Sequence, residues 1–67
     1  MTNEELTRLQ SIIDGINKEA SIQLVLSKRY GQMGVHLEPY NDNWYNLEDN
    51  NLLGQIRILA EVTKDVR

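Results

Sequence analysis

His36 is the only histidine of the chain, and it is the side chain best suited to acid–base chemistry near neutral pH. It lies between Val35 and Leu37, where apolar and polar residues alternate. A catalytic or metal-binding histidine needs a second reactive group beside it, and the sequence identifies none. The alternative is a surface histidine on the polar side of a β-strand. We favour this alternative, and we predict that the protein is not an enzyme and has no catalytic residues.

Oxygen-bearing side chains crowd residues 41–49: Asn41, Asp42, Asn43, Asn46, Glu48 and Asp49. Such side chains suit Ca²⁺, but an EF-hand loop needs glycine at its sixth position and glutamate at its twelfth. Counting from Asn41 or from Asp42 gives neither. Asparagine and aspartate also form turns and helix caps, which explains the same residues. We therefore predict no metal site and no bound cofactor.

A basic and aromatic patch, Lys28, Arg29 and Tyr30, precedes two glycines, Gly31 and Gly34. The glycines have the GXXG spacing that KH domains use against a nucleic-acid backbone, and Tyr30 could stack on a base. A KH loop joins two helices, however, whereas this segment lies between predicted strands. Two charges also make a weak electrostatic footprint. Nucleic-acid binding through Lys28, Arg29 and Tyr30 is therefore our alternative hypothesis for function.

Aromatic and acidic side chains come together in the segment from Tyr40 to Asp49. Aromatic residues often dominate protein interfaces, and nearby acids would steer a basic partner. Trp44 could instead fold back into the core, as tryptophan often does in a small domain. The sequence leaves these two roles of Trp44 open. The predicted partner-binding residues are Tyr40, Asp42, Trp44, Tyr45, Glu48 and Asp49.

The composition predicts one small folded domain over residues 1–67. Isoleucine, leucine and valine make up 19 of the 67 residues, well above the level typical of disordered chains. Cysteine is absent, which excludes disulfides and thiolate zinc sites. The net charge of -3 implies no general attraction to nucleic acid or anionic lipid. No apolar run is long enough to cross a bilayer, so we expect a cytoplasmic protein without a membrane role.

The clearest element is an amphipathic helix from Thr2 to Ala20. Thr2 and Glu5 have the spacing of a capping box at its start. Its apolar residues recur every three or four positions and form one narrow stripe: Leu6, Leu9, Ile12, Ile13, Ile16 and Ala20. Such a stripe must pack against the rest of the chain or against a second copy.

After Ala20, the spacing of apolar residues changes to every second position. Ile22, Leu24 and Leu26 alternate with less buried positions, which predicts a strand over residues 21–29. The glycine-containing segment 30–34 predicts a turn, and residues 35–38 resume the alternation before Pro39 ends the second strand. We therefore predict a β-hairpin followed by an asparagine-rich loop from Tyr40 to Asn51, in which Asn46, Asp49 or Asn50 could cap a second helix.

Residues 52–67 fit either a helix or a strand by periodicity, and their length favours a helix. The predicted fold class is thus α+β, with a helix–β-hairpin–helix (αββα) order and both helices packed together and against a two-stranded sheet. So small a sheet leaves open edges and apolar surface, which favours a homodimer. The predicted dimer seam comprises Leu6, Leu9, Ile13, Ile16, Ile58 and Val62.

In size and lack of motifs, the chain resembles the small accessory proteins carried by phages and other mobile elements, some of which block host enzymes or defence systems. This is a resemblance of type, and it assigns no roles to individual residues. With no reactive constellation in the sequence, we expect a non-catalytic protein-interaction module, a homodimer, that binds and regulates or inhibits a larger protein.

Overall fold

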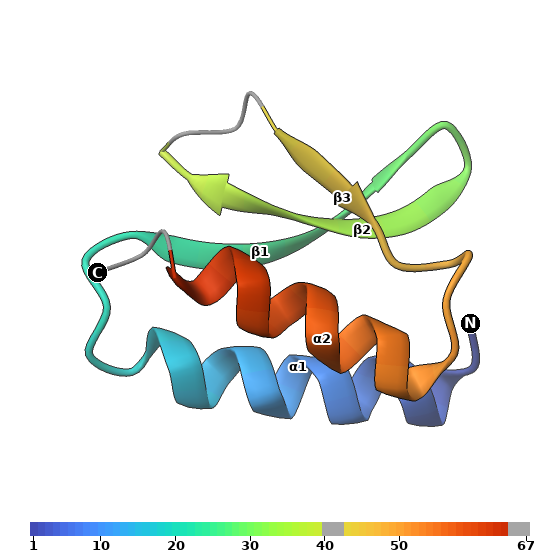
Figure 1. Ribbon diagram of the computed structural model, residues 1–67, viewed down its shortest axis with the longest axis horizontal. Helices are drawn as coiled ribbons and strands as arrows, with labels where there is room; N and C mark the ends of the chain where they lie inside the picture. Colours follow the sequence, from blue (N-terminus) through green and yellow to red (C-terminus); the bar gives the residue numbers. More distant parts are fainter. Residues whose placement is uncertain (40–42, 65–67) are drawn as a thin grey trace.

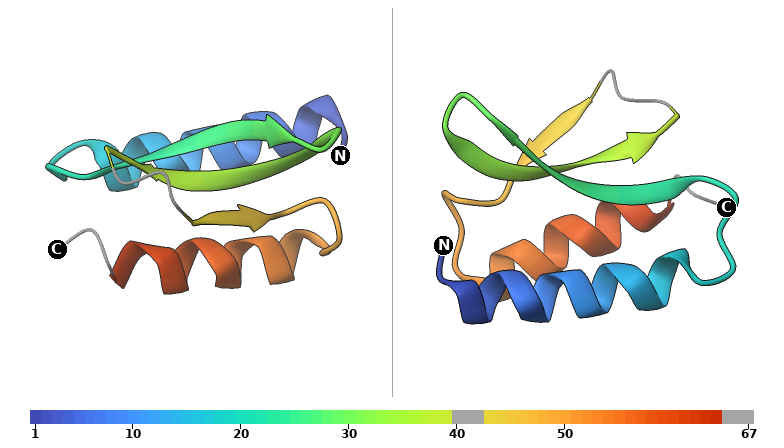
Figure 2. Two further views of the ribbon diagram at one scale, coloured as in Figure 1. Left: turned by 90° about the horizontal axis from the view of Figure 1, so that it is seen from above. Right: turned by 180° about the vertical axis from the view of Figure 1, so that it is seen from behind.

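The computed structural model of the protein describes residues 1–39 and 43–64. In these residues the chain forms α1 (Asn3–Asn17), β1 (Gln23–Arg29), β2 (Gln32–Glu38), β3 (Trp44–Asn46) and α2 (Leu52–Thr63) (Figure 1). The strands form one antiparallel sheet in the order β1-β2-β3, and both helices lie beneath the same side of it (Figures 1 and 2). The α+β class and the flanking helices are as predicted, but the sheet has three strands rather than two.

α1 begins where its capping box predicts. The Thr2 hydroxyl accepts from the Glu5 N–H at 3.1 Å, and the Glu5 carboxylate accepts from the Thr2 N–H at 3.4 Å. The helix ends at Asn17, a few residues before the predicted end. Leu9 and Ile13 of its apolar stripe are fully buried. The stripe therefore packs inside the chain.

β1 and β2 form the predicted hairpin, with Leu24 opposite Leu37, and Leu26 opposite Val35. These four residues share the side of the sheet that faces the helices, because side chains alternate along a strand and directly opposite residues lie on one side. The turn is shorter than predicted. Only Tyr30 and Gly31 separate the strands, and β2 already includes Gly34.

β3 corrects the prediction of a loop between Tyr40 and Asn51. Trp44, Tyr45 and Asn46 pair with His36, Val35 and Gly34. The Leu47 N–H also donates to the Met33 carbonyl at 3.0 Å, just beyond the strand. Three residues are too few to show an alternation of period two, so the sequence pattern could not distinguish this strand from a loop.

α2 confirms the helical interpretation of the C-terminal segment through Thr63; residues 65–67 lie outside the described chain. Its N-cap is Asn51, whose side chain accepts from the Gly54 N–H at 2.9 Å, rather than one of the three predicted caps. Gln55, one turn into α2, is buried, and its amide nitrogen donates to the Leu47 and Asn50 carbonyls, each at 3.0 Å. These bonds fix the start of α2 against the end of β3.

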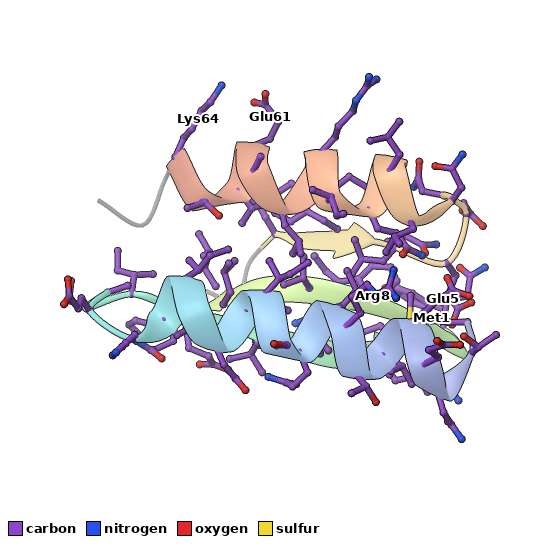
Figure 3. All side chains as sticks on the ribbon, turned by 90° about the horizontal axis from the view of Figure 1, so that it is seen from below. Met1, Glu5, Arg8, Glu61 and Lys64 are labelled. Atoms are coloured by element: carbon purple, nitrogen blue, oxygen red, sulfur yellow. The ribbon has the colours of Figure 1, made fainter. Side chains whose placement is uncertain are left out.

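The core lies between the sheet and the helix layer. It comprises Leu9, Ile13, Leu24, Val35, Leu47, Leu59 and Val62. Seen from above the sheet, α1 follows the β1 side and α2 follows the β3 side (Figure 2). Glu61 and Lys64 project from α2 on the side away from α1, and Lys64 Nζ lies 3.2 Å from Glu61 Oε1 (Figure 3).

Candidate functional site

Neither helix covers the upper side of the sheet in Figure 1, which we call the outer face. Its residues are those that alternate with the core-facing positions of the three strands. They include Val25, Ser27, Gly34, His36, Glu38 and Trp44. Two segments that the sequence analysis treated separately meet at the outer face. The predicted nucleic-acid segment forms the hairpin tip, and the predicted partner-binding segment contributes β3.

Trp44 lies flat over Gly34 on this face. A Cβ atom added to Gly34 would be 2.3–2.5 Å from three atoms of the Trp44 indole, so the indole would have to move. The indole N–H donates to the Ser27 carbonyl of β1 at 3.3 Å, which spans the whole width of the sheet. Trp44 is therefore neither a plug of the core between sheet and helices nor a detached loop residue. It is a half-buried lid on the outer face.

Tyr30 extends this aromatic surface to the hairpin tip. Its ring meets that of Trp44 edge to face, with centroids 6.1 Å apart, and the residue is nevertheless 91% exposed. Tyr30 has φ 56° and Gly31 has φ 75°. Positive φ at both turn residues matches a tight hairpin turn, for which asparagine and glycine are the usual pair. A bulky residue there is strained, and strain of this kind is often retained at functional sites.

Three polar side chains on the outer face form a continuous hydrogen-bonded chain. Ser27 Oγ lies 2.8 Å from His36 Nδ1, and His36 Nε2 lies 2.7 Å from Glu38 Oε1. With Glu38 ionised, Nε2 must carry the proton, so Nδ1 of a neutral His36 accepts from the Ser27 hydroxyl. His36 is only 6% exposed, which corrects the prediction of a surface histidine.

The sequence did carry a signal for this chain, because residues 36 and 38 of a strand must point to the same side. Ser27 could be identified only through the pairing of β1 with β2.

A serine, a histidine and an acid in a row are the parts of a nucleophilic site. Acyl transfer also needs free N–H groups to hold an oxyanion. Here the backbone groups of β1 and β2 that face each other are paired in the ladder, the open groups of β1 lie at its outward edge, and the indole N–H is bonded to the Ser27 carbonyl. The three hydrogen-bonded side chains link β1 to β2 on the outer face, beside Trp44.

The six predicted partner-binding residues do not share one surface. Trp44 faces outward, whereas its neighbour Tyr45 faces the helices and packs against the core. Asp49 is exposed, and its carboxylate accepts from the Asn46 amide at 3.2 Å. Tyr40 and Asp42 lie outside the described residues.

Glu48, another predicted partner-binding residue, joins three parts of the fold. Its carboxylate accepts from the terminal ammonium of Met1 at 3.0 Å and from the Met33 N–H at 3.4 Å. The hydrogen bond from the ammonium, helped by that from Met33, lowers the pKa of the Glu48 carboxyl below its ordinary value of 4.5. The Met1 side chain is almost fully buried just before the start of α1 (Figure 3). Glu48 therefore has a structural role.

The hairpin-tip residues separate in a similar way. Tyr30 belongs to the aromatic surface. Lys28, near the C-terminal end of β1, points to the side of the sheet that faces the helices, and it is exposed there. Gly34 lies within β2 under Trp44, so Gly31 and Gly34 do not form a phosphate-binding loop. As predicted from the sequence, this segment joins two strands, whereas a KH loop joins two helices.

Half of the predicted dimer seam is buried inside a single chain. Leu9, Ile13 and Val62 are buried within one chain and have almost no surface left for a second copy. Leu6, Ile16 and Ile58 remain partly accessible.

Within residues 1–39 and 43–64, no three histidine or acidic side chains come together as metal ligands. In the same part of the chain, neither helix has the length and apolarity needed to cross a membrane. Comparisons with protein-family models, with curated proteins and with solved structures find no match. The geometry of the outer face is therefore the basis for a functional proposal.

Proposed function

We propose that the protein is a non-catalytic interaction module that binds a larger protein through the outer face and regulates or inhibits it. The observation that carries the proposal is Tyr30. Its ring is 91% exposed, its backbone is held at positive φ, and it extends the surface of Trp44. Exposed aromatic residues are typical anchors of protein interfaces, since they bury a large area and lose little conformational entropy.

A protein partner fits this face better than nucleic acid does. Stacking of bases on an aromatic surface normally accompanies a positively charged groove. Here the only basic residues near the aromatic pair in sequence are Lys28 and Arg29, and the chain carries a net charge of -3. A partner that presents apolar and polar groups together suits a surface of Trp44, Tyr30 and Val25 bordered by Glu38.

Affinity capture with the immobilised intact protein tests the proposal. We expect wild type to retain a protein from host lysate after nuclease digestion, and Tyr30→Asn to lose it. Asparagine tolerates positive φ, so this substitution removes the ring and keeps the turn. Leu53→Ala is the matched control, because Leu53 is a 61% exposed apolar residue on α2, away from the outer face.

Equal capture by Tyr30→Asn and wild type would contradict the proposal. Retention that depends on intact nucleic acid and weakens steeply with salt would instead support the alternative hypothesis.

The homodimer also remains a proposal, but its interface would differ from the predicted dimer seam. Since half of the predicted seam is buried, a second copy would use either the outer face or the partly exposed Leu6, Ile16 and Ile58. Light scattering at micromolar concentration distinguishes a mass of one chain from that of two. A dimer that dissociates in Tyr30→Asn would place the second copy on the outer face.

A further inference from the structure

β1 is an edge strand, and its outward backbone groups can be assigned. The Leu24 N–H donates to Asn17 Oδ1 at 2.8 Å, and the Leu24 carbonyl accepts from Asn17 Nδ2 at 2.7 Å. Both groups of Leu24 therefore point away from β2. Since alternate residues of a strand direct their backbone groups to the same side, those of Leu26 and Lys28 point outward too. No residue of the described chain bonds to these outward groups of Leu26 and Lys28.

The Asn17 side chain shows what this edge accepts. Its carboxamide exchanges two hydrogen bonds with Leu24, as a peptide group of a neighbouring antiparallel strand would. Asn17 thus occupies the first position of a fourth strand. It leaves the next two positions, opposite Leu26 and Lys28, open.

A groove runs between α1 and this edge, directly beneath the open positions. Its volume is about 640 Å³, and its lining includes the apolar Leu6, Leu26 and Met33 and the polar Gln10 and Asp14. Asp14 lies one helical turn before Asn17, and so near the Leu24 end, while Lys28 is at the opposite end of the edge. The edge therefore has an acid at one end, a base at the other and apolar groups between them.

We propose that β1 binds an extended peptide segment of a partner protein as an antiparallel fourth strand opposite Leu26 and Lys28. Directly opposite residues share one side of a sheet, so the side chain opposite Leu26 enters the groove and is apolar. The residue opposite Lys28 is acidic. The segment leaves the edge at Asn17, which already occupies the position opposite Leu24, and its next residue on that side, which reaches Asp14, is basic. Read from its N-terminus, the segment has the pattern acid–x–apolar–x–base. Strand addition of this kind obtains affinity from main-chain hydrogen bonds and specificity from alternate side chains.

This inference is independent of the proposed function, because the edge and the outer face are different surfaces. It is tested by NMR titration of the intact, ¹⁵N-labelled protein with the synthetic peptide acetyl-Thr-Glu-Thr-Val-Thr-Lys-Thr-amide. We expect saturable shifts of the Leu26 and Lys28 amides and of α1 between Gln10 and Asp14. The Trp44 indole signal, which reports on the outer face, should not move.

Two controls separate the contribution of main-chain hydrogen bonds to peptide affinity from that of charge. Methylation of the valine nitrogen removes the bond to the Leu26 carbonyl and should weaken the affinity obtained from the titration about tenfold, whereas methylation of the next threonine, which faces away, should not. The peptide with glutamate and lysine exchanged should bind more weakly by about threefold. That difference should shrink in Asp14→Asn, a change of an exposed side chain. Absence of shifts at Leu26 and Lys28, or equal responses to both methylated peptides, would overturn the proposal.

Discussion

At the scale of single residues, the outer face depends on one glycine. Trp44 can lie flat on the sheet because Gly34 has no side chain, and Tyr30 can meet Trp44 because the turn holds it in a conformation unusual for tyrosine. His36 and Ser27 lie beside this aromatic pair and satisfy one another's polar atoms. Side chains of β1 and β2 thus form the polar network of the outer face, and Trp44 of β3 is tied to it through the Ser27 carbonyl.

Gly34→Ala should displace Trp44, because the new Cβ atom would overlap the indole. We expect a loss of about 1–3 kcal/mol in the free energy of unfolding, typical of overpacking, and a red shift in the emission of the only tryptophan. Chemical denaturation monitored by fluorescence measures both. Gly15→Ala is the control, since no atom lies within 4 Å of its added Cβ, and it should stabilise α1 by about 0.5–1 kcal/mol. An unchanged spectrum in Gly34→Ala would contradict the placement of Trp44.

Glu48 predicts how stability depends on pH. Its pKa is lowered in the folded state, so between the folded and unfolded pKa values the unfolded chain binds more protons. The ion pair therefore contributes its full stability above the ordinary pKa of 4.5, and this contribution is lost as pH falls through the lower folded value. Thermal melts from pH 7 to pH 3 should show a smaller acid-induced loss in Glu48→Gln than in wild type. Parallel pH profiles of the two proteins would argue against this role of Glu48.

At the scale of elements, the sequence predicted what a long periodic pattern can specify. The capping box of Thr2 and Glu5 gave the start of α1, and the alternation of Leu24 and Leu26 gave the buried side of β1. The 12-residue α2 was correctly favoured over a strand by its length. These elements have enough residues for their period to appear in the sequence.

What the sequence could not predict depends on contacts between distant residues. β3 is a strand because Trp44–Asn46 pair with the far side of β2, and no local pattern of three residues reveals that pairing. The contact of Tyr30 with Trp44 and that of Ser27 with His36 likewise arise from the register of the sheet. The sequence therefore placed Trp44 and Tyr30 in two separate candidate sites, and only the structure shows that their rings are in contact.

The N-cap of α2 gives a test at this scale. Asn51→Ala removes the acceptor for the Gly54 N–H and should lower the free energy of unfolding by about 1 kcal/mol. Asn51→Asp keeps an acceptor and should remain close to wild type in urea denaturation. If alanine and aspartate were equally stable at this position, α2 would not depend on its cap.

At the scale of the whole molecule, the arrangement is two layers with one exposed sheet. Both helices cover one side of the three strands, so the buried cluster lies between the sheet and the helices, and neither helix covers the outer face (Figure 2). The third strand also satisfies one edge of the central β2, which a two-stranded hairpin would have left open. The function that we propose requires an accessible aromatic group, and Tyr30 at the hairpin tip provides one.

The most direct test of the proposed binding face is a calorimetric titration of the captured partner into wild type and into Tyr30→Asn, with urea denaturation of both. We predict that the variant loses about 2 kcal/mol or more of binding free energy, as expected for an aromatic anchor. Its stability should stay within about 1 kcal/mol of wild type, because relief of the positive-φ strain offsets the lost ring contact. Unchanged partner affinity in a stably folded Tyr30→Asn would contradict the account.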